Sequence, residues 1–176
     1  LDTDFSQWEK SFSTNFFGQL QLMHGVRKLA NLNATAIFFT GGAPGGVLKN
    51  YSSYSIAKIG LTKMVEYLDA EDHEIKYSII GPGWVDTKIH QTTLTAGEQN
   101  AGENYQKTKF MLENDQCFSM EKVVECCDWL VNSKRDLISG RNFSAVNDPW
   151  QDQKINTIIN DSNNFKLRRY GNKIFD

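Results

Sequence analysis

The sequence has few cysteines, few prolines and no long apolar run. Its 176 residues include three cysteines and three prolines. No apolar stretch approaches the ~20 residues that a membrane-spanning helix needs. The net charge of −2 provides no basic surplus for binding nucleic acid or an anionic membrane. We therefore expect a cytoplasmic globular protein that binds neither nucleic acid nor a membrane.

The cysteines and histidines do not form the pattern of a metal site. Cys117, Cys126 and Cys127 are an odd number, lack CxxC spacing and include an adjacent pair. This arrangement disfavours both a disulfide framework and a structural zinc site. The three histidines are scattered without ligand spacing. We expect reduced thiols and a metal-free protein.

Two short apolar runs predict buried strands of a parallel sheet. TAIFFT at 35–40 breaks into glycines, and the run at 75–81 breaks at Pro82. Both are apolar on successive residues, which is typical of parallel strands covered on both faces. A helix is expected at about 53–70 between them, and a third strand at about 137–146. Parallel α/β sheets bind ligands beyond the carboxyl ends of their strands, so the two glycine-rich breaks mark the expected site.

Two further helices and a long polar segment are predicted around these strands. A helix at 6–30, with Ser6 as its N-cap, has aromatic and apolar residues at four-residue spacing. Another helix is expected at about 119–133, with Ser119 as its N-cap. Residues 86–116 between the second strand and this helix are polar and turn-rich, and their length suits a functional flap.

The most informative pair of residues is Tyr54 and Lys58, in the stretch YSSYSIAK. Because they are four residues apart in a predicted helix, both side chains project from one face. An ammonium beside a phenol favours the phenolate and lowers the phenol pKa from its ordinary value near ~10. The pair therefore predicts a tyrosine that exchanges protons near neutral pH. By itself this spacing also occurs by chance on amphipathic helices.

Together with its surroundings, this pair resembles the YxxxK motif of the short-chain dehydrogenase/reductases, in their single-domain branch. The segment GPGWVDT at 81–87 is similar to the PGxVxT turn of that family. Asn15, in STNFFG, lies 39 residues before Tyr54 and is similar in position to the asparagine of the family's catalytic tetrad. Three matches in the right order are more specific than any one of them.

The resemblance implies a Rossmann-like doubly wound parallel sheet, NAD or NADP as cofactor, and a carbonyl or secondary alcohol as substrate. Tyr54 would be the general acid and base, and the backbone of Asn15 would hold a water that continues the proton relay. The helices equivalent to 6–30 and 53–70 build a dimer interface in the family, which implies a homodimer or homotetramer. The implied cofactor-binding residues are Tyr54, Lys58, Pro82, Gly83, Val85 and Thr87, with Thr87 facing the nicotinamide carboxamide.

The serine of the family's tetrad is missing. Its position, counted back from Tyr54, falls on Gly41, which has no hydroxyl. Thr40 lies directly before it, and a threonine hydroxyl can donate to a substrate carbonyl oxygen as a serine can. We predict that Thr40 takes this role. The other interpretation is that Thr40 is only a β-branched strand residue and that the serine role is lost.

The family's opening strand and TGxxxGxG loop do not precede Asn15. TGGAPGG at 40–46 imitates that loop, but we interpret it as the active-site loop after a middle strand. We expect residues 1–176 to be a single domain that carries the later strands and helices of a Rossmann fold and lacks the N-terminal nucleotide-binding strands. A C-terminal extension is expected at about 147–176. Either the sequence is trimmed from a longer enzyme, which we favour, or another chain completes the sheet.

The sequence therefore predicts an NAD(P)-dependent oxidoreductase of the short-chain type. An alternative is a catalytically weakened member that acts as a cofactor-binding or interaction protein, because the tetrad serine is absent. A fragment with only an interaction role, and a sugar epimerase or dehydratase that shares YxxxK but not the PGxVxT turn, are further alternatives. The C-terminal segment weakly resembles family members of polysaccharide or nucleotide-sugar metabolism. The expected substrate is therefore a small molecule, and sugar-related compounds are among the candidates.

Overall fold

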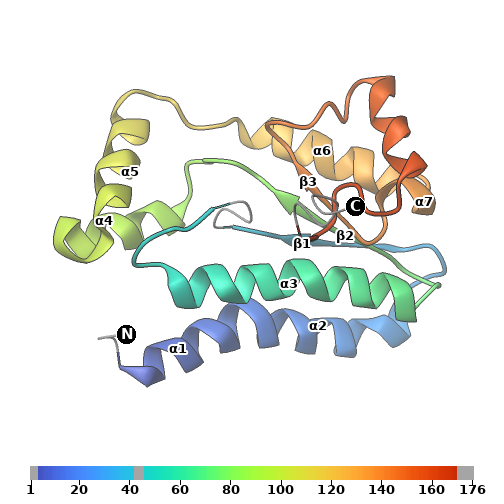
Figure 1. The fold of residues 1–176 in the computed structure, drawn as a ribbon, viewed down its shortest axis with the longest axis horizontal. Helices are drawn as coiled ribbons and strands as arrows, with labels where there is room; N and C mark the ends of the chain where they lie inside the picture. The colour runs from blue at the N-terminus through green and yellow to red at the C-terminus, as the bar shows by residue number, and fades with distance from the viewer. Residues whose placement is uncertain (1–3, 42–45, 170–176) are drawn as a thin grey trace, which may run out of the picture.

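The computed structural model describes residues 4–41 and 46–169, and it contains a parallel three-stranded sheet with helices on both faces (Figure 1). The strands are β1 (Thr35–Phe39), β2 (Lys76–Gly81) and β3 (Arg141–Ser144), in the order β1-β2-β3. Phe39 lies opposite Ile80, and Gly81 lies opposite Ser144. The predicted α/β fold class is confirmed, and the carboxyl ends of all three strands meet at one edge.

One face of the sheet is covered by a long helical segment and by α3 (Ser52–Glu71). The segment consists of α1 (Phe5–Phe12), the π-helical turn η1 (Ser13–Phe17), α2 (Gly18–Val26) and the 3-10 turn η2 (Arg27–Leu29). It lies beside α3 in Figure 1, and the Phe16 ring packs on Gly60 of α3. The predicted helices at 6–30 and 53–70 are thus confirmed, with a π turn that the periodicity did not indicate.

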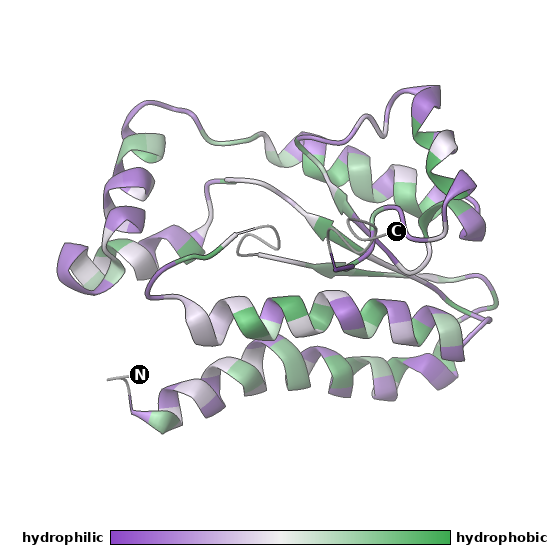
Figure 2. Cartoon of the chain, in the orientation of Figure 1, coloured by the Kyte–Doolittle hydropathy of each residue, from purple (hydrophilic) through white to green (hydrophobic). Residues whose placement is uncertain are grey.

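The opposite face carries α6 (Met120–Asn132), α7 (Arg135–Ile138) and the 3-10 helix η3 (Gln153–Asn160). The remaining helices, α4 (Lys88–Ala101) and α5 (Glu103–Glu113), project beyond the sheet on the side of its carboxyl edge (Figure 1). Their residues are mostly hydrophilic, whereas α2 and α3 contain many apolar residues (Figure 2). None of the helices in the described part of the chain is long and apolar enough to cross a membrane.

The two faces of β2 belong to two separate apolar clusters. Ile79 packs in one cluster with Leu61 and Val65 of α3, and Ile80 packs in the other with Leu130 of α6. All five of these side chains are fully buried. Since neighbouring residues of a strand point to opposite faces, this explains why the run is apolar at successive positions.

Several local predictions need correction. The third strand is only Arg141–Ser144, because residues 137 and 138 at the start of the predicted strand at 137–146 belong to helix α7. Asp4, not Ser6, caps α1, and its carboxylate accepts from the Ser6 backbone N–H at 3.1 Å. Ser119 does occupy the N-cap position of α6, but its hydroxyl donates to the Glu121 carboxylate and not to a backbone group.

The flap is helical, which its polar and turn-rich composition did not indicate. Residues 88–113 of the predicted flap at 86–116 form α4 and α5, joined at Gly102, where φ is +58°. Gly97 within α4 also has a positive φ of +74° and kinks the helix there. Glycine adopts this left-handed conformation without the steric cost that a Cβ brings, so the two glycines fold the segment into a compact unit.

The outer edge of β1 pairs with no strand among residues 4–41 and 46–169. An apolar groove of about 280 Å³ borders this edge, between β1 and α2. Leu22 and Val26 of α2 line it together with Phe38 of β1.

Candidate active site

Tyr54 lies in the first turn of α3, with its phenolic oxygen against the backbone that follows β1. A Cβ built on Gly41 would lie 2.1 Å from the Tyr54 hydroxyl oxygen, far inside van der Waals contact. Only a glycine at this position allows the phenol to come so close to the main chain. The structure therefore places the phenol at the carboxyl end of β1, where parallel α/β folds bind their ligands.

Lys58 lies one helical turn further along α3 and on the same side as Tyr54. Its Nζ is 5.9 Å from the centroid of the Tyr54 ring. The ammonium donates a hydrogen bond of 2.9 Å to the Phe39 carbonyl, which anchors it to the end of β1. An ammonium has three donors, so this bond leaves others for a ligand. Tyr54 and Lys58, the pair predicted from the sequence, thus lie next to each other at the end of β1.

The expected effect of this ammonium on the phenol pKa is not what the structure shows. Burial raises the pKa of Tyr54 above its ordinary value, because the charged phenolate is poorly solvated there. Burial also lowers the pKa of Lys58, since it disfavours the charged ammonium. The prediction that Lys58 lowers the pKa of Tyr54 is therefore wrong. Desolvation dominates the pKa of Tyr54, because the Lys58 ammonium is bonded to the Phe39 carbonyl and not to the phenolic oxygen.

Thr40, the predicted substitute for the missing serine, is buried directly after β1. Its backbone N–H donates to the Ile80 carbonyl at 2.9 Å, which extends the strand pairing by one residue. Its methyl group faces Gly81, where a built Cβ would lie 3.4 Å from Cγ2. Within the described residues, no hydrogen bond joins the Thr40 hydroxyl to Tyr54. The contact that the structure shows for the phenolic oxygen is with Gly41.

Asn15 lies inside the π-helical turn η1, on the helix segment that packs beside α3. Its side-chain amide donates to the Ser11 carbonyl at 3.1 Å. A π turn inserts one extra residue and interrupts the regular ladder of helical hydrogen bonds, and such turns are frequent at functional sites. The Gly18 backbone N–H bonds to the Ser13 carbonyl across this turn. The helix distortion therefore falls at the residue that the tetrad comparison selects.

The PGxVxT-like segment follows β2 and leads into α4. Gly83 has a φ of +78°, and a Cβ there would lie 2.3 Å from Val146 Cγ2, so the turn requires glycine. Val85 is buried and forms an isolated parallel bridge with Phe118. Thr87 is exposed at the N-cap position of α4, and Pro82 is half-buried. The segment thus lies at the same sheet edge as Tyr54 and Lys58.

Three contacts that the sequence did not reveal tie the flap to this edge. The Tyr51 hydroxyl, just before α3, lies 3.0 Å from the Thr93 hydroxyl of α4. Trp84 stacks on His90 of α4 with ring centroids 5.0 Å apart, and Lys107 of α5 lies 5.2 Å above the Trp84 ring. These partners are far apart or irregularly spaced in the chain, so no periodic pattern could have indicated them.

His90 is further held by a backbone contact that sets its tautomer. Its Nε2 lies 2.8 Å from the Val85 carbonyl, and because a carbonyl only accepts, Nε2 carries the proton. Residues 42–45 of the predicted glycine loop at 40–46 lie outside the described residues. The site as described therefore combines the phenol and ammonium of α3, the turn after β2 and the helical flap.

Comparison with known proteins finds a family model that matches most of the chain. Residues 1–145 match the family model described as "Enoyl-(Acyl carrier protein) reductase". The chain is 21% identical over 143 residues to an uncharacterized oxidoreductase of Schizosaccharomyces pombe, an alignment that covers 80% of this chain and 58% of that protein.

Solved structures of similar fold are also found. A short-chain dehydrogenase/reductase of Saccharomyces cerevisiae matches with a TM-score of 0.69 and 21% identity, over 84% of this chain and 60% of that one. The KRED1-Pglu enzyme matches with a TM-score of 0.70 and 21% identity, over 80% and 60%. A short-chain dehydrogenase family protein of Francisella tularensis matches with a TM-score of 0.64 and 18% identity, over 81% and 62%. The chain spans about three fifths of the length of these relatives.

Proposed function

Because this chain belongs to the short-chain dehydrogenase/reductase family, we propose that it serves as the catalytic part of an NAD(P)-dependent oxidoreductase. The proposed reaction interconverts a carbonyl and a secondary alcohol by hydride transfer. The observation that carries the proposal is the placement of the Tyr54 oxygen against Gly41, with the Lys58 ammonium anchored to Phe39 beside it. One phenol and one cation at the carboxyl edge of a parallel sheet can position and protonate a carbonyl oxygen.

Several residues at this edge fit a nicotinamide cofactor. Lys58 has free donors for ribose hydroxyls, and Thr87 is exposed in the segment after β2. Gly83 adds no side chain to the turn after β2, and Pro82 and Val85 shape the backbone of that turn. A bound nicotinamide cofactor would supply or accept the hydride, which is chemistry that no protein side chain offers. The preference between NAD and NADP is left open by these residues.

In the reductive direction Tyr54 gives its proton to the carbonyl oxygen while the carbonyl carbon receives the hydride. The O–H bond of the phenol breaks, and the O–H bond of the product alcohol forms. The phenolate is then reprotonated from solvent, along a path that would include a water on the backbone at Asn15. Because burial raises the pKa of Tyr54, the phenol is protonated at neutral pH, which is the form that reduction requires.

The substrate oxygen needs a second hydrogen-bond donor, and Thr40 is the proposed one. Thr40 directly precedes Gly41, the residue that contacts the phenol, although the Thr40 methyl group faces Gly81. A donor aimed at the carbonyl oxygen stabilises the negative charge that develops there. The polar flap formed by α4 and α5 would cover a small substrate, and its hydrophilic residues are compatible with a sugar-related one.

A second candidate function is cofactor binding with weak or no turnover. The observation that favours it is the lack of any side-chain hydroxyl bonded to the Tyr54 oxygen in the described part of the chain, since Gly41 occupies that side. A protein of this kind would bind NAD or NADP and respond to it, and its interactions would depend on the helices of the α1–α3 face.

One experiment separates the two candidates. The purified protein is titrated with NADH and NADPH by calorimetry, and cofactor oxidation is then followed with a panel of ketones, aldehydes, keto sugars and an enoyl thioester. Saturable binding with oxidation dependent on a ketone or aldehyde supports the proposed reaction. Binding without turnover supports the second candidate. Turnover with the enoyl thioester alone would mean that the reduced group is a conjugated double bond and not a carbonyl. A protein that binds neither cofactor contradicts both.

A further inference from the structure

A second polar site lies at the opposite end of the sheet from Tyr54. A hollow of about 410 Å³ is lined by Asp69, Arg135, Asp136, Ser139, Arg141 and Lys166. Asp69 lies fifteen residues after Tyr54 on the same helix, so at a rise of 1.5 Å per residue the two are about 22 Å apart. The hollow is therefore separate from the candidate active site. Its volume is in the range of small-molecule sites.

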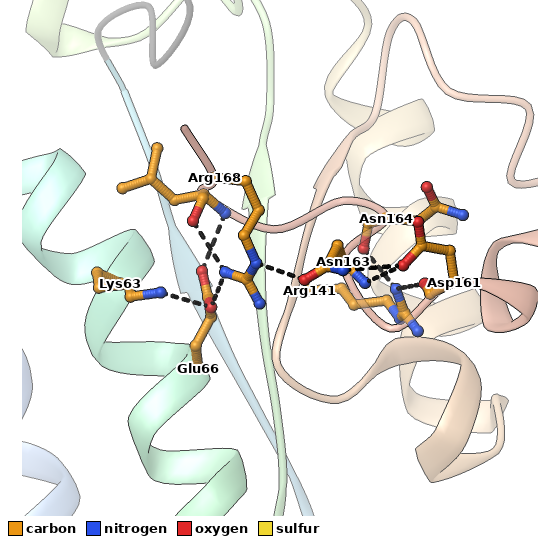
Figure 3. Close-up of polar contacts among 8 residues, drawn as sticks. Lys63, Glu66, Arg141, Asp161, Asn163, Asn164 and Arg168 are labelled. Atoms are coloured by element: carbon orange, nitrogen blue, oxygen red, sulfur yellow. Dashed lines mark hydrogen bonds and ion pairs between the residues drawn. The ribbon is translucent and has the colours of Figure 1, made fainter. Parts of the chain in front are cut away.

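Arg141, the first residue of β3, supplies a buried cation to this hollow. Its side chain is only 5% exposed. Nη1 donates to the backbone carbonyls of Asn164 and Asp161, and Figure 3 shows this arginine held against the C-terminal segment. Among the described residues, the Nε–H has no hydrogen-bond acceptor and no carboxylate forms an ion pair with the guanidinium. A buried donor without an acceptor is costly and rare in native proteins.

Lys166 brings a second cation to the same hollow. It is half-buried, and within the described residues its ammonium forms neither an ion pair nor a hydrogen bond. Burial and the nearby Arg141 together lower its pKa, which places the two cations within electrostatic reach of each other. Two like charges that face one hollow repel, and an anion between them would remove that repulsion.

The carboxylates around the hollow do not cancel these charges. Asp69 is already paired with Arg135 at 2.6 Å, and Arg135 also donates to the carbonyls of Ile75 and Asp72. Likewise Glu66 accepts from Lys63 and from Arg168, as Figure 3 shows, so it is also committed. Three cations and two carboxylates line the hollow, and they leave a net charge of +1. The carboxylates left near the two cations are Asp136 and Asp161, both exposed, and neither forms an ion pair with Arg141 or Lys166 among the described residues.

We propose that this hollow is a binding site for the phosphate group of a small phosphate ester, held between Arg141 and Lys166. Because Nη1 is taken by backbone carbonyls, the planar guanidinium offers Nη2 to a phosphate oxygen. The ammonium of Lys166 adds a second donor as a point charge. Asp136 at the rim can accept from hydroxyl groups of the ester. The ligand would bind far from Tyr54, as a regulator or an anchor and not as the reacting group.

The proposal is tested by calorimetric titration of the protein with inorganic phosphate, glycerol phosphate and glycerol at constant ionic strength. The unmodified protein should bind both phosphate compounds saturably and should not bind glycerol. Lys166→Gln removes one donor cation without touching a described hydrogen bond, and it should weaken the affinity for phosphate by about 10-fold or more. Lys154→Gln makes the same charge change on exposed η3, outside the hollow, and should leave the affinity unchanged.

Three results would overturn the site. These are a lack of saturable binding by the unmodified protein, equal weakening by Lys166→Gln and Lys154→Gln, and binding of glycerol as tight as that of glycerol phosphate. Because Lys166 has no described partner, its replacement should preserve the fold, which is checked by thermal unfolding without phosphate. Neither NADH nor a carbonyl substrate enters these titrations, so a failure here leaves the proposed oxidoreductase activity unaffected.

Discussion

At the scale of single residues, the site depends on a glycine in a place where the family has a serine. Gly41 allows the Tyr54 oxygen to approach the backbone so closely that even a methyl group would collide with it. The absence of a side chain therefore sets the position of the phenol. The hydroxyl that a serine would provide has to come from Thr40 or not be provided at all.

This arrangement predicts a large effect of Gly41→Ala. A methyl group 2.1 Å from the phenolic oxygen has to displace the phenol by about 1 Å, and a misplacement of that size can cost about 100-fold in rate. We expect turnover to fall by about 10-fold to 100-fold with little change in cofactor affinity. Gly25→Ala is the matched control, because nothing lies within 4 Å of a Cβ at that exposed helical position. Equal turnover of the two variants would contradict the contact.

At the scale of elements, Asp72 joins three of them at the end of α3. Its carboxylate accepts from the Tyr77 hydroxyl of β2 at 2.7 Å and from Arg27 of η2 at 2.8 Å. Its other oxygen accepts from the Glu74 backbone N–H at 2.9 Å. Burial opposes the charge, but these donors outweigh it and lower the pKa of Asp72 from 3.8 to about 2. The cluster fixes how α2 and α3 lie against the sheet.

A lowered pKa in the folded state predicts stability that is lost in acid. The stabilisation by Asp72 is complete above pH ~4, the range in which the unfolded chain is also ionised, and it disappears as the pH falls through about 2. We expect it to amount to roughly 1–2 kcal/mol, allowing for solvent screening. Denaturant unfolding between pH 2 and pH 7 measures this contribution. Asp72→Asn should flatten the profile, whereas Glu74→Gln should not, because Glu74 makes only an exposed ion pair with Arg27.

The elements and their order could be predicted from the sequence, but the contacts between them could not. The runs at 35–40 and 75–81 indicated parallel strands because their apolar residues face both layers, as Ile79 and Ile80 do. The spacing of Tyr54 and Lys58 placed them on one helix face. Burial of the pair, which decides the direction of the pKa shifts, depends on how distant segments pack and has no signal in the local pattern. The helical flap was missed because its folding depends on two glycines at positive φ within a polar stretch.

At the scale of the whole molecule, the helical layer beside the free edge of β1 carries exposed apolar side chains. The layer of α1 to α3 exposes Phe17 at 52% and Ile56 at 50%, and the groove beside β1 is also apolar. Exposed apolar groups on neighbouring helices are typical of a surface that associates with another subunit. A homodimer or homotetramer built through this layer is therefore a proposal that follows from both the family resemblance and the exposed residues.

Sedimentation velocity tests this proposal on the purified protein. Ile56→Glu introduces a charge on α3, and it should shift the protein to a smaller species if this layer is the interface. Val124→Glu makes the same change at a side chain 53% exposed on α6, on the other face of the sheet, and should leave the assembly intact. A monomeric unmodified protein, or dissociation caused by Val124→Glu alone, would contradict the assignment of the interface.

The most direct test of the proposed function is the rate of hydride transfer in Tyr54→Phe, measured beside Tyr67→Phe. Both variants remove one phenolic hydroxyl from α3, but Tyr67 is 59% exposed and far from Gly41. If Tyr54 transfers the proton, Tyr54→Phe should lower kcat by about 10²–10⁴-fold while cofactor affinity changes little, and Tyr67→Phe should behave as the unmodified protein. Near-normal kcat in Tyr54→Phe would contradict the role of this phenol in the reaction.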